Sequence, residues 1–214
     1  MNTAALQRTV LVSPGSAQED QSRAGFYALL ARLFIAPPDA RLLQSIMIAP
    51  ESDPHMQSAD SPLLESWRRL ATAAGTVSPE ALEDEFNRLF VSVGRCDVMP
   101  FASYFLTGFM HEKPLAKLRA DLSLLGLSRS EAVLETEDHI AALCDVMRFL
   151  IVGDGENLAA SIAAQKAFFA AHLQPWVVQF CQTVTQAEKA NFYKHVANFA
   201  QAFFEIEIAA FEIE

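Results

Sequence analysis

The spacing of hydrophobic positions predicts a protein built from helices. From residue 19 onward, apolar side chains recur three and four positions apart, as they do on one face of a helix. The first stripe consists of Phe26, Leu29, Leu30, Leu33 and Phe34. Similar stripes predict helices over residues 39–46, 62–74, 79–90, 114–125, 138–152, 157–171, 176–184 and 192–210. Because strand-like alternation is confined to short runs, we expect an all-α fold of about eight to ten helices.

Turn residues and composition along the chain predict its organisation. The polar stretch 1–18 is expected to be a flexible leader, and residues 19–214 a single globular helical domain. Ser78-Pro79 is a typical helix start, and Gly126 is expected to cap the end of a helix. Residues 128–138 then connect an N-terminal helical half to a C-terminal half.

The stretch from Glu135 to His139 stands out between the two halves. Three carboxylates and one imidazole fall within it, directly before an apolar helical stripe. One interpretation is an ordinary helix start, with Thr136 as N-cap and acids in the first turn. The other interpretation is a small acidic binding site that contains a titratable histidine. The glutamates at the end of the last predicted helix oppose its dipole, so we expect that end, including Glu207, to fray.

Composition limits the classes of function. The chain has 214 residues, 51% of them hydrophobic, and a net charge of −10. Half-apolar chains of this length bury a substantial core, and an acidic chain does not fit a nucleic-acid binder. There is no apolar run of membrane-span length and no secretory signal, and the three cysteines lack CxxC spacing. We therefore expect a soluble cytoplasmic protein without stable membrane insertion.

Motifs for common chemistry are missing. The sequence has neither GxxxxGK[ST] nor a GxGxxG turn after a strand, and its five histidines form no HExxH or zinc-type spacing. A catalytic pair that forms only in space stays open, but no residue indicates one. We predict no enzyme, no catalytic residues, no metal and no cofactor.

Four segments together resemble a known family. They are Glu85-Phe86-Asn87-Arg88-Leu89-Phe90-Val91, Met99-Pro100-Phe101-Ala102-Ser103-Tyr104-Phe105-Leu106, Glu135-Thr136-Glu137-Asp138-His139-Ile140, and His172-Leu173-Gln174-Pro175-Trp176. In this order and spacing, between about Phe26 and Phe204, the chain resembles the TorD/DmsD family of cytoplasmic chaperones for molybdoenzymes.

The resemblance implies both a fold and a function. It implies an all-helical protein with the Glu135–His139 stretch at a hinge near 128–138. It also implies a chaperone that binds the apo-form of a molybdopterin-containing oxidoreductase, and its twin-arginine signal peptide, and delays export until the cofactor is inserted. Residues linked to peptide binding in the family match Asp138 and His139, and the aromatic segment matches Phe101, Ser103 and Tyr104. The sequence departs from the family at Thr136, where proline is common, and at Phe101, where some relatives have tryptophan.

A receptor for a leader of two arginines and an apolar run needs carboxylates beside an apolar groove. Glu135, Glu137 and Asp138 supply acceptors, and the expected groove is formed by Phe86, Leu89, Phe90, Phe101, Tyr104 and Phe105. Core packing is an equal alternative for Phe86, Leu89 and Phe90, and for His139 the alternative is closure of a helical turn. The alternative functions are a nucleotide (GTP)-binding regulator, since GTP binding has been proposed in the family, and a helical adaptor. Monomer and domain-swapped dimer are both compatible with the hinge.

Overall fold

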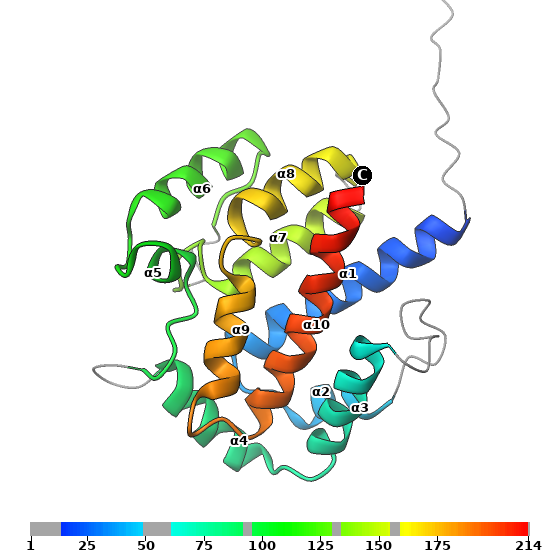
Figure 1. Cartoon of the computed structure of the whole chain (residues 1–214), viewed down its shortest axis with the longest axis vertical. Coiled ribbons are helices and arrows are strands. Elements are labelled where there is room, and N and C mark those ends of the chain that lie inside the picture. The colour runs from blue at the N-terminus through cyan, green and yellow to red at the C-terminus, as the bar shows by residue number, and fades with distance from the viewer. Residues whose placement is uncertain (1–13, 49–60, 92–95, 130–133, 155–158, 214) are drawn as a thin grey trace, which may run out of the picture.

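The computed structural model describes residues 14–48, 61–91, 96–129, 134–154 and 159–213, with side chains from residue 18 onward (Figure 1). These residues form ten α-helices and one π-helical turn and contain no strand, so the all-α prediction is confirmed. The elements are α1 Pro14–Ile35, α2 Ala40–Met47, α3 Pro62–Ala74, α4 Pro79–Phe86, η2 Asn87–Val91, α5 Ala102–Thr107, α6 Lys113–Leu124, α7 Ile140–Val152, α8 Ile162–His172, α9 Val177–Gln186 and α10 Phe192–Ile213.

The helix ends follow local sequence signals. Ser61 and Ser78 cap α3 and α4 through their side-chain oxygens, each directly before a proline. Gly126 adopts a φ of 72° just after α6, which confirms its predicted role because glycine tolerates this conformation. The expected leader boundary at residues 18 and 19 falls inside α1, and residues 1–13 lie outside the described residues. The predicted start of a helix at Asn157 is also outside them, and α8 begins at Ile162 behind its N-cap Ser161.

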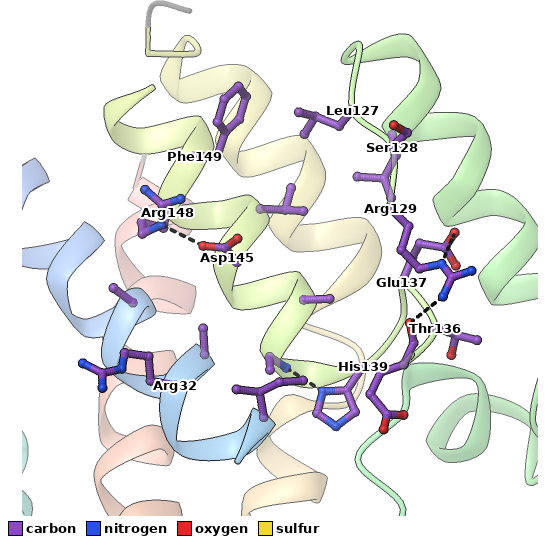
Figure 2. Close-up of a pocket in the computed structure, with 18 residues that line it drawn as sticks. Arg32, Leu127, Ser128, Arg129, Thr136, Glu137, His139, Asp145, Arg148 and Phe149 are labelled. Atoms are coloured by element: carbon purple, nitrogen blue, oxygen red, sulfur yellow. Dashed lines mark hydrogen bonds and ion pairs between the residues drawn. The ribbon is translucent and has the colours of Figure 1, made fainter. Parts of the chain in front are cut away.

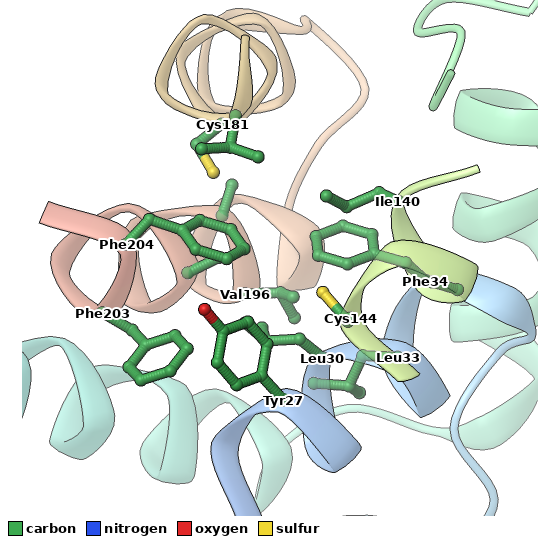
Figure 3. Packing of buried hydrophobic residues seen from close by; sticks show 14 of the residues in the cluster. Tyr27, Leu30, Leu33, Phe34, Ile140, Cys144, Cys181, Val196, Phe203 and Phe204 are labelled. Atoms are coloured by element: carbon green, nitrogen blue, oxygen red, sulfur yellow. The ribbon is translucent and has the colours of Figure 1, made fainter. Parts of the chain in front are cut away.

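The core lies between the first helix and the C-terminal half of the chain. Helix α1 packs along α7, and α10 packs against α3 and α9. Tyr27 and Phe34 of α1 meet Cys144 of α7, Cys181 of α9 and Phe204 of α10 in one buried cluster (Figure 3). The two halves of the sequence therefore share one hydrophobic core. None of the described helices is long and apolar enough to cross a membrane.

The acidic end of α10 corrects one prediction. Glu207 is buried, and the helix continues past it to Ile213, so the expected fraying is wrong at this residue. Its carboxylate accepts hydrogen bonds from Arg23 Nε at 2.8 Å, Arg23 Nη2 at 3.0 Å and the Tyr27 hydroxyl at 2.9 Å. The glutamate that opposes the dipole of its own helix is thus compensated by an arginine of α1.

The start of α10 is held by another buried glutamate. Glu85 of α4 accepts the backbone N–H groups of Asn191 at 2.8 Å, Phe192 at 3.1 Å and Tyr193 at 2.8 Å. The first N–H groups of a helix have no partner within the helix, and a carboxylate at this end also suits the dipole. Glu85 therefore fixes α4 to the N-terminus of α10.

Candidate binding pocket beside residues 135–139

Helix α7 begins later than the sequence suggested. Its N-cap is His139, whose Nδ1 accepts the N–H of Ala141 at 3.1 Å, so the prediction of Thr136 as N-cap is wrong. The Thr136 hydroxyl instead donates to Asp138 at 2.7 Å, and the Thr136 carbonyl accepts the N–H of His139 at 3.0 Å. These bonds close a turn in front of the helix, and the acidic residues lie before its first turn rather than within it.

The acidic stretch and the aromatic segment meet in space. Phe101 and His139 form an antiparallel bridge, in which Ala102 N–H donates to the Asp138 carbonyl and Ile140 N–H to the Pro100 carbonyl. Asp138 also accepts the N–H of Ser103 through its carboxylate at 3.0 Å. Asp138, Ser103 and His139 are only 1%, 0% and 4% exposed. Their contact is therefore a closed joint between the start of α5 and the start of α7.

His139 is held in its neutral form. Burial lowers the pKa of its imidazole to about 4, and the neighbouring Asp138 carboxylate opposes that shift only in part. The Phe101 ring lies against it edge-on, with ring centroids 5.0 Å apart. A neutral imidazole can present a lone pair on Nδ1. That lone pair accepts the N–H of Ala141 and so caps the helix.

A pocket of about 610 Å³ opens beside this joint, between the second half of α1, helix α7, residues 127–129 and residues 135–139 (Figure 2). Its wall is largely apolar and includes Ala28, Ala31, Ile35, Ala142, Val146 and Phe149. Three carboxylates line it, from Glu135, Glu137 and Asp145, together with three arginines, Arg32, Arg129 and Arg148. It thus combines an apolar interior with acceptors and donors of charge-assisted hydrogen bonds.

Two of the pocket carboxylates already form ion pairs. Glu137 accepts Arg119 Nε at 3.0 Å and Nη2 at 2.9 Å, and Asp145 accepts Arg148 Nε at 2.8 Å. Partial burial raises the pKa of Glu137, but the hydrogen bonds from Arg119, a backbone hydrogen bond and the charges of Arg119 and Arg129 together outweigh burial and hold that pKa below its usual value. Glu135 is exposed, and its carbonyl oxygen lies 3.5 Å from Arg129 Nη1.

A second cavity lies on the other side of residues 135–139. It measures about 400 Å³ and is bounded by residues of α5, α6, α7 and α8, among them Lys113, Lys117 and Ala171. Asp138 lines this cavity, whereas its neighbour His139 lines the larger pocket. On the same side, Asp121 of α6 binds His172 Nε2 at 2.8 Å and Lys117 Nζ at 2.7 Å. Within the described residues, no three His, Cys, Asp or Glu side chains gather in a way that would hold a metal ion.

The structure separates the residues that the sequence grouped into one binding site. Glu135 and His139 line the larger pocket, whereas Phe101 and Ser103 belong to the joint and Tyr104 is half-buried on α5. The other three predicted residues, Phe86, Leu89 and Phe90, are buried in the core. There the ring of Phe90 contacts the rings of Phe34, Phe86 and Tyr193. Sequence reasoning missed the α1 side of the pocket, although Ala28 and Ala31 left a signal as small residues on one helix face.

Comparison with protein families gives residues 56–182 as a match to the family described as nitrate reductase delta subunit. The chain belongs to this family. Curated relatives include the chaperone protein TorD of Vibrio cholerae, 29% identical over 128 residues, and that of Photobacterium profundum, 27% identical over 155 residues. The matched regions cover 57% and 68% of this chain, and 58% and 72% of those relatives. The resemblance inferred from four segments is therefore confirmed.

A solved structure supports the fold of this delta-subunit family member. A crystal structure of a candidate redox enzyme maturation protein from Archaeoglobus fulgidus superposes with a TM-score of 0.59 at 18% identity. The superposition covers 93% of this chain and 99% of that protein. At this identity the likeness establishes the arrangement of helices alone.

Proposed function

We propose that the protein is a cytoplasmic chaperone for the maturation of a molybdopterin-containing oxidoreductase. It binds the apo-form of that enzyme through a twin-arginine leader and delays export until the cofactor is inserted. Membership of the family and the chaperone name of the curated relatives support this class of function. The observation that carries the proposal is the apolar pocket of about 610 Å³ with carboxylates at its rim.

The chemistry of such a leader fits the chemistry of this pocket. An apolar run can cover Ala142, Val146 and Phe149, while guanidinium groups can reach the rim acceptors Glu135 and Glu137. Exposed ion pairs contribute only about 0 to 1 kcal/mol each, whereas burial of apolar surface contributes about 25 cal/mol per Å². The apolar wall therefore supplies most of the affinity, and the carboxylates orient the peptide.

The other predicted site residues have a supporting role in this proposal. Asp138, Ser103 and Phe101 fix the position of His139 and the residues before it, and so shape one wall of the pocket. Phe86, Leu89 and Phe90 act through the core behind them.

Filling each cavity in turn tests the proposal. Ala142 and Ala171 are both half-buried helix residues, one lining the larger pocket and the other the smaller cavity. Titration calorimetry would use synthetic leaders of molybdopterin oxidoreductases from the same organism, with circular dichroism to verify folding. We expect Ala142→Phe to weaken binding at least about tenfold and the matched Ala171→Phe to leave it unchanged. No binding by the unmodified protein, or equal binding by Ala142→Phe, would exclude this assignment.

A further inference from the structure

Glu137 is covered by the protein's own arginines. Arg119 of α6 places Nε and Nη2 on one carboxylate oxygen, at 3.0 and 2.9 Å, and Arg129 Nε lies 3.9 Å from the other. The side chain of Glu137 is 13% exposed, whereas that of Arg119 is 53% exposed. The acceptor is thus held mainly inside the protein, and its partner extends toward solvent.

This arrangement resembles the complex that an incoming leader would make. A guanidinium from a peptide would donate to the Glu137 carboxylate. Arg119 already occupies that acceptor with a guanidinium of the same planar shape. Glu137 is consequently not a bare negative charge in the wall of the pocket. A peptide arginine reaches it only when Arg119 moves away, and an ion pair so exposed is weak enough to exchange.

We propose that Arg119 is a built-in competitor for the arginines of the leader, and that a leader arginine binds Glu137 only by displacing it. This inference rests on the proposed function. Lysine carries the same charge but lacks the planar fork, so it replaces Arg119 less well. The apparent affinity for any cationic peptide falls by the fraction of time that Glu137 is occupied.

Removal of the competitor should strengthen binding of any cationic peptide that uses Glu137. We expect Arg119→Gln to bind the twin-arginine leader about fivefold more tightly, corresponding to occupation of Glu137 for about four-fifths of the time. Binding of the same leader with both arginines changed to lysine should be weaker in both proteins but should improve by a similar factor, because the competitor is removed for either peptide. The matched control is Arg69→Gln, because Arg69 forms an exposed pair of similar geometry with Glu65 on α3, at 2.8 Å, outside the pocket.

A double-mutant cycle separates displacement from a general effect of charge. In a Glu137→Gln background, Arg119→Gln should give no gain, since the contested acceptor is absent, whereas a long-range charge effect would persist. Calorimetry with both leaders on the four variants of the cycle and on Arg69→Gln gives the required affinities. If the unmodified protein binds the leader but Arg119→Gln gives no gain, the competitor role is overturned and the proposed function stands. The same conclusion follows if the gain persists in the Glu137→Gln background. No binding by either the unmodified protein or Arg119→Gln removes both.

Discussion

The carboxylate of Asp138 accepts the backbone N–H of Ser103 at 3.0 Å, across 35 positions of sequence. Its other oxygen accepts the hydroxyl of Thr136, and the residue is buried between the starts of α5 and α7. A carboxylate with both oxygens engaged in this way is not available to a ligand unless the joint opens. Asp138 therefore acts on the pocket by fixing the chain around it.

Replacement of Asp138 should accordingly affect stability. We expect Asp138→Ala to lower the free energy of unfolding by about 2 to 4 kcal/mol, because the buried N–H of Ser103 loses a charged acceptor. Asp138→Asn keeps an acceptor oxygen and should lose less. Urea unfolding measures both, and Glu135→Ala, an exposed neighbour, should stay within about 0.5 kcal/mol of the unmodified protein. Equal stability of Asp138→Ala and Glu135→Ala would show that the joint contributes little.

The buried imidazole of His139 predicts a dependence of stability on pH. Its pKa is lowered from 6.5 to about 4 in the folded protein, so the unfolded chain binds the proton first as the pH falls. The stabilisation is fully present above pH 6.5 and is lost toward pH 4, by about 3 kcal/mol in total. His139→Asn keeps a side-chain acceptor at the N-cap but does not titrate.

The measurement compares the two proteins across this range. Unfolding of the unmodified protein and of His139→Asn in urea at pH 7.5, 6, 5 and 4 gives the difference in free energy at each pH. Other groups titrate in both proteins and cancel in the difference. We expect the difference to change by about 3 kcal/mol in favour of the variant at low pH. Parallel curves would show that His139 is not held neutral.

The helices could be predicted from sequence because their determinants are local. The stripe from Phe26 to Phe34 and the caps at Ser61 and Ser78 depend on residues within a few positions of each other. Thr136 failed as a predicted N-cap for the opposite reason. The turn that delays α7 is held partly by backbone contacts with Pro100, about forty positions away, which no helical pattern encodes.

The pocket was predictable only in part. Glu135 and His139 were candidate residues because an acidic stretch before an apolar stripe is visible in the sequence, and both line the pocket. The wall from Ala28 to Ile35 depends on how α1 lies along α7, and the pairing of Glu137 with Arg119 depends on the position of α6. Such pairings are set by tertiary packing, so residue types alone do not indicate them.

Glu85 should be a major stabilising residue. We expect Glu85→Ala to lower the free energy of unfolding by about 2 to 4 kcal/mol, because three N–H groups at the start of α10 lose their acceptor. Glu85→Gln retains one oxygen and should lose a smaller amount. Thermal and urea unfolding measure the effect, with Glu83→Ala as an exposed control on the same helix. A loss no larger than that of Glu83→Ala would contradict the capping role.

The buried pair of Arg23 and Glu207 should show strong coupling. Glu207→Leu leaves the guanidinium of Arg23 and the hydroxyl of Tyr27 without this acceptor, so we expect a loss of about 3 to 5 kcal/mol. Arg23→Met should cause a comparable loss, since it leaves a carboxylate buried in the core. The double variant removes both charges, and its loss should be smaller than the sum of the two single losses by at least about 2 kcal/mol.

The exposed pair of Arg69 and Glu65 provides the reference for this cycle. It has a similar Nε to carboxylate distance of 2.8 Å, but its side chains are 64% and 54% exposed. Water screens that interaction, so its coupling energy should fall between about 0 and 1 kcal/mol. Urea unfolding of both sets of variants at pH 7.5 gives the two coupling energies. A coupling between Arg23 and Glu207 no greater than that of the exposed pair would mean that α1 and α10 are held together by their aromatic contacts alone, among them Tyr27 against Phe203 at 4.9 Å between ring centroids.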